Sequence, residues 1–210
     1  MNKMSVLYVQ EFELLGKRGR IFKGLSDEVR PENAWVFTDP TTVAYRKLDG
    51  AACAIIEGKM YARIMVGQGK KKRNKKIEKP IDAIPAQPEP DPITGQHPHW
   101  VPTEGKPQYK WFNHTMDKFG PYEDGTYELC GSKIGGDPEA TGEKAFAISH
   151  TDPHLLLELP SELNKTTLRE MIEGNPYEGI IFKNANGDYC KLRRFDFMLK
   201  GFNKIVNESL

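Results

Sequence analysis

The sequence has few cysteines and no pair of them with metal-binding spacing. Its 210 residues contain three, Cys53, Cys130 and Cys190, with no Cys-x-x-Cys pair among them. An odd and widely spaced set argues against a disulfide scaffold and against a structural zinc site. A reducing compartment is therefore expected, and the sequence predicts a cytoplasmic protein.

Long apolar runs and a strong net charge are also missing. No stretch approaches the roughly 20 apolar residues that span a bilayer, and Lys3 interrupts the N-terminus too early for a signal peptide. The net charge is only +1, with 30 Lys and Arg against 29 Asp and Glu. We therefore expect no membrane partner, and any affinity for nucleic acid must come from a local patch.

The sequence does contain a series of short β-prone runs joined by turn residues. Strands are predicted at 43–47, 51–57, 60–66, 126–130, 154–159, 177–183 and 189–197, and a helix with Ser161 as its N-cap is predicted to extend to about Glu173. Asp49-Gly50 and Gly58-Lys59, between the first three strands, are hairpin signals. Strands outnumber helices, so the expected fold is α+β, with antiparallel sheets and flanking helices in a single domain over residues 1–210.

A basic and proline-rich stretch interrupts this pattern at about residues 70–107. Residues 70–79 hold seven Lys or Arg and one acid, and residues 80–107 hold eight of the fifteen prolines. Proline lacks a backbone donor and fixes φ, so this stretch is expected to be a surface insertion without helices or inner strands, anchored by aromatic residues such as Trp100 and Trp111. The basic run would either neutralise RNA phosphates or form a solvated loop.

The run Lys47-Leu48-Asp49-Gly50 carries the strongest chemical signal. A lysine amine is a good nucleophile only when neutral, and a site lowers its pKa by desolvation or by neighbouring cations. Asp49 lies on the same face of an extended segment as Lys47, where it would orient the amine or a metal-bound water. Gly50 lets the backbone turn and a nucleotide approach closely. On its own, the tetrapeptide more often marks a surface lysine before a turn.

Charged residues in the last two predicted strands complete a set that suits phosphoryl transfer. This chemistry needs cations on the non-bridging oxygens and carboxylates that hold a metal ion. Lys191 and Arg193 point the same way along one strand and suit the first task, and Glu178 suits the second. A regular strand would turn Lys183 and Glu178 to opposite faces. A solvated hairpin of alternating charge is the structural alternative.

In their order and spacing, these motifs resemble those of the covalent nucleotidyltransferase superfamily of nucleic-acid ligases and mRNA capping enzymes. Lys47-Leu48-Asp49-Gly50 is similar to the first motif, in which lysine is joined to a nucleoside monophosphate. Arg63 is similar to the cation of an intermediate motif. The third, fourth and fifth motifs are similar to Tyr127-Glu128-Leu129-Cys130-Gly131, Glu178-Gly179-Ile180 and Lys191-Leu192-Arg193.

The sequence is more closely similar to a family of small ATP-dependent 5′-to-3′ RNA ligases from animals and some viruses, over roughly residues 40–195. The stretches that carry this resemblance are Tyr61-Ala62-Arg63, Trp100-Val101-Pro102, Gln108-Tyr109-Lys110-Trp111 and Gly131-Ser132-Lys133-Ile134-Gly135-Gly136-Asp137-Pro138. The resemblance implies an ATP-grasp-like ligase domain. It also implies that Lys47 attacks the α-phosphate of ATP and releases pyrophosphate. AMP would then pass to an RNA 5′-phosphate, and a 3′-hydroxyl would displace AMP to seal the strand.

The resemblance further implies a role for each site residue. Lys47, Asp49 and Glu178 would be catalytic, and Asp49 and Glu178 would hold Mg²⁺ or Mn²⁺. The nucleotide would be bound by Arg46, Lys47, Gly50, Arg63, Glu128, Lys183, Lys191 and Arg193. The implied partners of this protein, expected as a monomer, are ATP and RNA with 5′-phosphate and 3′-hydroxyl ends.

Two departures from the superfamily bear on the substrate. The fifth motif usually carries two lysines, and here the second is Arg193, which keeps the charge and changes the donor geometry. Little sequence follows this motif, so the appended OB-fold of DNA ligases and capping enzymes is not expected. GTP-dependent mRNA capping and a non-catalytic RNA-binding protein are the alternative functions.

Overall fold

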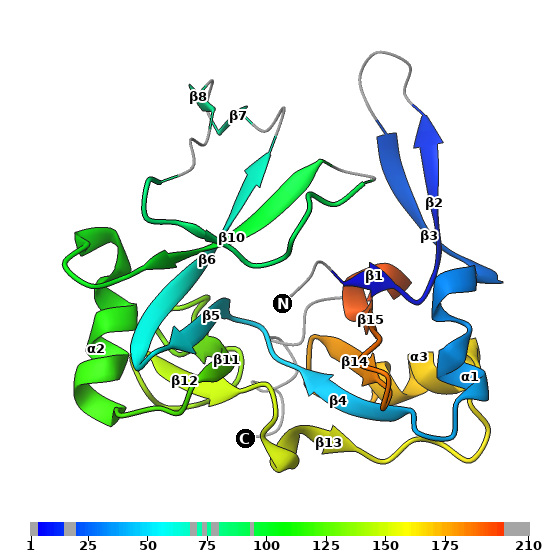
Figure 1. The fold of residues 1–210 in the computed structure, drawn as a ribbon. Coiled ribbons are helices and arrows are strands. Elements are labelled where there is room, and N and C mark those ends of the chain that lie inside the picture. The colour runs from blue at the N-terminus through cyan, green and yellow to red at the C-terminus, as the bar shows by residue number, and fades with distance from the viewer. Residues whose placement is uncertain are drawn as a thin grey trace. The chain divides into compact units, whose positions relative to one another are not determined.

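Two large sheets organise the chain, each in a compact unit of its own (Figure 1). The computed structural model describes residues 4–14, 20–67, 71–72, 75–76, 80–92 and 95–199. Unit 1 comprises Met1–Lys3 and Asp49–Thr151, and unit 2 comprises Met4–Leu48 and Asp152–Leu210. The sheets are mostly antiparallel and the helices few, which confirms the predicted α+β class.

Unit 1 contains a six-stranded sheet in the order β12-β11-β5-β6-β10-β9. Its strands are β5 (Ala51–Ile56), β6 (Lys59–Gly67), β9 (Ile84–Pro85), β10 (Gln96–Pro102), β11 (Gly125–Cys130) and β12 (Phe146–Ser149). β5 and β6 form the hairpin signalled at Gly58, where the Asp124 carboxylate accepts the N–H groups of Glu57 and Gly58 at 2.8 and 3.0 Å. The three strands predicted from this unit's sequence are therefore confirmed.

The proline-rich stretch contains an inner strand, so the prediction of a surface insertion without inner strands is wrong. β10 lies between β6 and β9 and pairs along its whole length with β6. The N–H of Thr103 donates to the Met60 carbonyl at 3.0 Å. Because antiparallel bonds alternate, the nitrogens of Pro98 and Pro102 face away from β6. These prolines remove no donor from that ladder, and Trp100 is buried within it.

Helix α2 (Lys110–Phe119) packs on this sheet where the sequence predicts no helix. Its Trp111, Phe112 and Met116 lie against a buried cluster that includes Ile55 and Leu129. A short 3-10 turn, Pro107–Tyr109, leads into it. The apolar residues at helical spacing bury one side of α2, and that tertiary packing stabilises a helix too short to persist alone.

The predicted basic run lies mostly outside the described residues. Only the backbones of β7 (Lys71–Lys72) and β8 (Lys75–Lys76) are described, and they pair with each other in antiparallel fashion. The expected contact of this run with RNA therefore stays a prediction.

Unit 2 contains a five-stranded sheet in the order β1-β15-β14-β4-β13. Its strands are β1 (Ser5–Val6), β4 (Val43–Lys47), β13 (Leu156–Leu157), β14 (Gly179–Lys183) and β15 (Tyr189–Arg193). β1 runs parallel to β15, and the other pairs are antiparallel. One face of the sheet is buried with α3, and the residues that form this core face are Ala44, Ile180, Phe182, Cys190 and Leu192.

Helix α3 spans Lys165–Glu173 and its N-cap is Asn164, so the N-cap predicted at Ser161 is wrong by three residues. The side chain of Asn164 accepts the N–H groups of Thr166 and Thr167 at 2.9 and 3.0 Å. The hydroxyl of Thr167 in turn accepts the N–H of Asn164, completing a capping box. Asn164 is therefore the N-cap, because its side chain accepts the first free N–H groups of the helix.

Two predicted strands of unit 2 are shorter than expected. In place of a strand at 154–159, a 3-10 turn (Pro153–Leu155) leads into β13. β15 ends at Arg193, and the 3-10 turn η5 (Arg194–Phe197) follows because the Asp196 carboxylate accepts the N–H of Arg193 at 2.9 Å. A polar side chain thus ends the strand where the sequence pattern continues.

A long hairpin extends away from the five-stranded sheet of unit 2 (Figure 1). It consists of β2 (Tyr8–Leu14) and β3 (Arg20–Val29), which pair in antiparallel fashion with register shifts. A 3-10 turn (Pro31–Asn33) and the short helix α1 (Trp35–Thr38) connect it to β4. The sequence predicts none of these N-terminal elements.

Candidate active site

The face of the unit 2 sheet opposite its core gathers cationic side chains. Lys47 on β4 and Arg193 on β15 are both cross-strand partners of Gly179 on the central strand β14. Side chains alternate along a strand, so residues at odd positions here lie opposite the buried core residues. The cations placed on this face are Lys47, Lys183, Lys191 and Arg193.

Gly179 permits the close packing of these strands. A Cβ added at this position would overlap the backbone carbonyl of Leu192 and lie 2.8 Å from the Cα of Arg193. Real Cβ atoms do not approach backbone this closely, so only glycine fits without a shift of β15. The Glu178-Gly179 pair predicted from sequence therefore has a steric reason for its glycine.

Lys47 and Glu178 form an ion pair in unit 2. The ammonium group of Lys47 also donates to the Leu48 carbonyl at 3.2 Å, and the two charged side chains are 17% and 27% exposed. Glu178 lies in a bend just ahead of β14, so strand alternation does not set its direction. The structure thus brings the predicted nucleophile and the predicted metal ligand into contact.

Burial, and for Lys191 also like charge, disfavours the protonated form of two lysines on this face. Burial lowers the pKa of Lys191 to about 8, and the charges of Arg193 and Lys47 lower it as well. Burial also lowers the pKa of Lys183, whose ammonium lies 4.5 Å from the centre of the Tyr45 ring. An anion bound on this face would raise the pKa of Lys191 and that of Lys183 toward their ordinary values.

Arg193 is oriented by a carboxylate that the sequence did not single out. Asp196, which is fully buried, accepts the Nε and Nη2 donors of Arg193 at 3.0 and 2.8 Å. This pairing raises the pKa of Arg193. The amide of Gln10 donates to the same carboxylate at 3.2 Å. Two of the five N–H donors of the guanidinium group are thereby used to orient it.

Arg46 is not brought to this face. It is the cross-strand partner of Ile180, so its side chain leaves β4 on the core side, opposite Lys47. Its charge acts there on Tyr177, lowering a pKa that burial raises above its ordinary value. The structure therefore separates Arg46 from the other cations predicted to bind the nucleotide.

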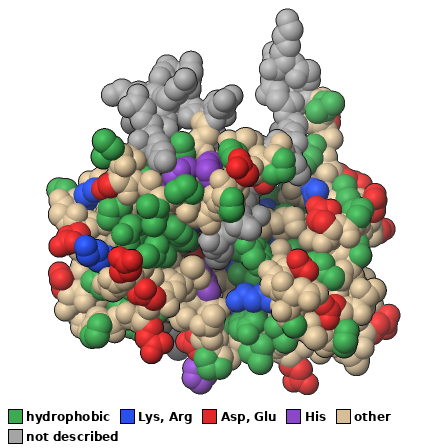
Figure 2. All heavy atoms as spheres, in the orientation of Figure 1, with side chains coloured by type: hydrophobic (Ala, Val, Ile, Leu, Met, Phe, Trp, Pro, Cys, Tyr) green, Lys and Arg blue, Asp and Glu red, His purple; other side chains and the backbone are tan. Residues whose placement is uncertain are grey.

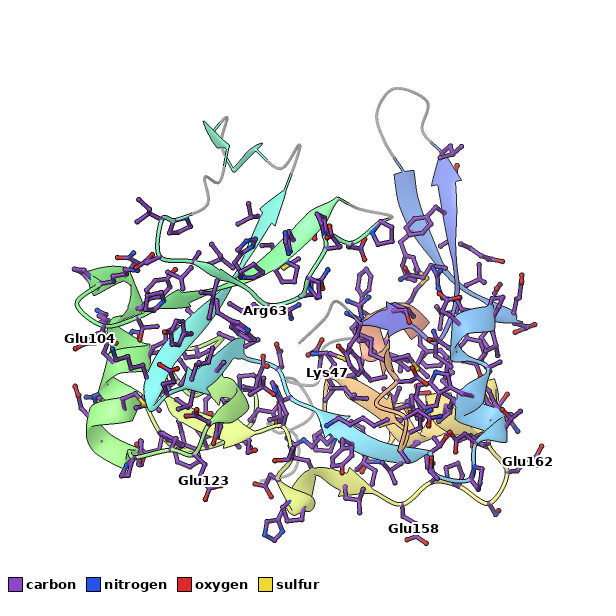
Figure 3. The ribbon with its side chains drawn as sticks, viewed as in Figure 1. Lys47, Arg63, Glu104, Glu123, Glu158 and Glu162 are labelled. Carbon is purple, nitrogen blue, oxygen red and sulfur yellow. The ribbon has the colours of Figure 1, made fainter. Side chains whose placement is uncertain are left out.

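The remaining predicted site residues belong to unit 1. Figure 3 labels Arg63, which lies on β6 opposite Trp100 of β10, and Lys47 of unit 2. The carboxylate of Glu128 on β11 lies 3.2 Å from His150 Nε2, and both side chains are nearly buried. The other ring nitrogen of His150 lies 3.1 Å from the Thr126 hydroxyl. His150 thus holds Glu128 in place, and the sequence predicted no such role for it.

The Asp49-Gly50 turn is held by a side-chain hydrogen bond and by close packing within unit 1. The N–H of Asp49 donates to the Glu139 carboxylate at 2.8 Å. A Cβ on Gly50 would overlap the Leu129 carbonyl and lie 3.0 Å from Cys130 Sγ. Burial and the three nearby carboxylates raise the pKa of the Cys130 thiol, and those carboxylates are Glu128, Glu139 and Asp49.

In Figure 2, Lys, Arg, Asp and Glu side chains are scattered in small groups over the visible face, without a large area of one sign among the coloured atoms. Among the residues that the structure describes, no group of three or more His, Cys, Asp or Glu side chains is arranged to hold a metal ion. Within the same part of the chain, every helix is too short or too polar to cross a membrane.

Comparison with protein-family models and with curated protein sequences gives no match to this chain. The resemblance to RNA ligases therefore rests on the order of the motifs, and the site rests on its own geometry.

Proposed function

We propose that the protein is an ATP-dependent RNA ligase in which Lys47 carries AMP. The observation that supports this proposal best is the position of Lys47. Its amine contacts Glu178 on a sheet face that it shares with Lys191 and Arg193. A nucleophile, a carboxylate and phosphate-binding cations are the groups that covalent nucleotidyl transfer requires.

The cations are suited to bind a phosphate. At pH 7 a lysine with a pKa of about 8 is mostly protonated, and an arriving phosphate would move the pKa of Lys191 back toward its ordinary value. Arg193 is already oriented by Asp196, so less conformational entropy is lost when its remaining donors bind an anion. Both residues would hold the α-phosphate while Lys47 attacks it.

The carboxylates fit a divalent cation of the kind that ATP carries. Mg²⁺ is usually held by one or two carboxylates together with substrate phosphates, so a complete protein cage is not required. Glu178 would supply such a ligand in unit 2, and Asp49 is the second carboxylate proposed. When bound, the ion would neutralise charge on the phosphates.

The choice of ATP and RNA rests on the family resemblance. Arg63 and Glu128 would bind the nucleotide, and the acceptor would be an RNA 5′-phosphate joined to a 3′-hydroxyl. A capping enzyme would instead take GTP, and a non-catalytic RNA-binding protein would take neither nucleotide covalently.

Incubation with labelled ATP or GTP and Mg²⁺, followed by mass measurement of the intact chain, tests the first step. We expect one AMP per chain from ATP, and none in Lys47→Ala. Lys59→Ala is the matched control, because Lys59 is an exposed lysine at the start of β6. Label retained from GTP alone would favour capping.

Sealing of a 5′-phosphorylated nicked or single-stranded RNA tests the later steps. Wild type and Lys59→Ala should join the ends, and Lys47→Ala should not. Sealing of the RNA by Lys47→Ala would contradict the proposed mechanism.

A further inference from the structure

Three phenylalanines form an exposed aromatic patch in unit 2. The ring of Phe195, in η5, stacks on Phe22 of β3 with centroids 5.1 Å apart and an interplanar angle of 19°. Phe22 meets Phe12 of β2 edge to face at 5.6 Å. Phe195 is 59% exposed and Phe12 is 36% exposed. The aromatic patch, defined as Phe12, Phe22 and Phe195, therefore presents ring surface to solvent.

The strand pattern of the hairpin separates this patch from acidic side chains. Phe12 and Phe22 are cross-strand partners, so their rings leave the same face of the β2–β3 hairpin. Gln10 shares that face, whereas Glu11 and Glu13 alternate to the other one. Glu13 pairs there with Lys23, at 2.5 Å.

The aromatic patch adjoins the cationic face of the candidate active site. The guanidinium carbon of Arg193 lies 5.6 Å from the centre of the Phe195 ring. Gln10, on the hairpin face that carries Phe12, donates to Asp196, the carboxylate that orients Arg193. Hydrogen bonds from Gln10 and from Arg193 to Asp196 thus connect the hairpin, η5 and β15.

From this placement we infer that the aromatic patch stacks the unpaired bases of a single-stranded RNA end. Single-stranded nucleic acid combines a phosphate backbone with aromatic faces, and its binding sites pair cations with exposed aromatic side chains. Here Arg193 and Lys191 would bind the backbone, and Phe195 and Phe12 would contact bases. The inference rests on the proposed function, and it names the class of RNA that would be joined.

Charge complementarity favours RNA over a protein partner or a second copy of the chain. Lys47, Lys191 and Arg193 share one sheet face beside the patch, and a polyanion would compensate these like charges. A purely apolar partner would cover the rings and leave these charges uncompensated.

The test compares two labelled probes of equal length and charge, a 5′-phosphorylated oligoadenylate and the same oligomer with abasic sugars. Binding of each to the full chain is measured by fluorescence anisotropy. Wild type should prefer the oligoadenylate. Phe12→Leu and Phe195→Leu should each weaken oligoadenylate binding by about fivefold or more, and leave the abasic probe unaffected.

Matched variants separate stacking from general damage. Leucine keeps apolar contact and removes the aromatic face, and Phe12→Leu leaves the contact between Arg193 and Phe195 untouched. Leu156→Ala is the control, since Leu156 is 52% exposed on β13 at the other edge of the sheet. Its preference for the oligoadenylate should match that of wild type.

Three results would overturn the inference. In the first, wild type binds both probes equally. In the second, the Phe12→Leu, Phe195→Leu double variant keeps the base preference. In the third, wild type sediments as a dimer that the same double variant dissociates, which would make the patch an interface between copies.

Formation of lysyl-AMP from ATP, which needs no RNA, separates failure of this inference from failure of the proposed function. If wild type forms no lysyl-AMP but loses base preference in the phenylalanine variants, the patch stands and the ligase proposal fails. If lysyl-AMP forms in every variant and base preference never appears, the ligase proposal stands and the patch fails.

Discussion

Lys191 is a residue whose charge the fold disfavours, and this has a measurable consequence for stability. Its pKa is about 8 in the folded protein and about 10.4 in an unfolded chain. Between these values the unfolded state binds more protons, so the free energy of unfolding rises with pH across that window. Below pH 8 Lys191 is charged in both states, so the whole cost of holding its charge in the folded protein is present. Lys191→Met should therefore raise the free energy of unfolding at pH 7 by roughly 1–2 kcal/mol.

Urea unfolding at pH 7 and at pH 10.5 checks this expectation. The gain from Lys191→Met should shrink between the two, because the folded lysine has lost its proton at the higher pH. Lys59→Met, at an exposed position, should leave the free energy of unfolding unchanged at both pH values. A loss of stability in Lys191→Met at pH 7 would contradict the inferred cost of burying this charge beside Arg193 and Lys47.

His150 offers a second prediction at the scale of one residue. It contacts Glu128 and Thr126, so it fixes the carboxylate proposed to bind the nucleotide. His150→Ala should raise the ATP concentration for half-maximal lysyl-AMP formation about fivefold, the loss of roughly one hydrogen bond. His154→Ala, at an exposed position nearby in sequence, should have no effect. An unchanged ATP dependence in His150→Ala would separate Glu128 from nucleotide binding.

At the scale of elements, the cap of α3 is a simple test of the structure. Asn164 satisfies two N–H groups at the start of this helix, whose buried Leu168 and Ile172 belong to the core of unit 2. Asn164→Ala should lower the free energy of unfolding by about 1 kcal/mol. Asn186→Ala, in the exposed turn between β14 and β15, should lower it less. Equal effects in a thermal melt would place the helix start elsewhere.

The elements that could be predicted from sequence are those whose signals are local. Alternation and turn residues located β4, β5, β6 and β11 to within a residue or two. β10 was missed because prolines argue against an inner strand, and only the pairing with β6 shows that their nitrogens face away from that ladder. α2 was missed because its helical character depends on burial against the sheet of unit 1.

The same distinction applies to the candidate site. Lys47, Lys191 and Arg193 could be singled out because strand alternation and motif order agree on them. Glu178 could be singled out from motif order alone, since it lies in a bend ahead of β14. Asp196, His150 and Glu139 could not, because each acts through a contact with a distant or irregular segment. Arg46 differs from these cations, since one step along the strand turns its side chain to the other face of the sheet.

At the scale of the whole molecule, the division into units predicts independent folding of unit 1. Residues 49–151 contain every strand of the six-stranded sheet and the buried cluster around Ile55 and Leu129. This segment, expressed alone, should unfold cooperatively in a thermal melt followed by circular dichroism. A piece ending at Asp124, which lacks β11 and β12, should not. Loss of cooperativity in the longer segment would contradict the division.

The pairing of β13 with β4 has a further consequence. Leu156 lies opposite Tyr45 and Leu157 opposite Ala44, so the chain leaves and re-enters unit 2 through one antiparallel pair. In topological terms, residues 49–151 of unit 1 are the loop of a single antiparallel strand pair. Replacing residues 49–151 with a tight turn would yield a miniature protein that keeps Lys47, Glu178, Lys191 and Arg193. Such a chain would allow the reactivity of the lysine to be measured apart from the nucleotide recognition that we propose for Arg63 and Glu128.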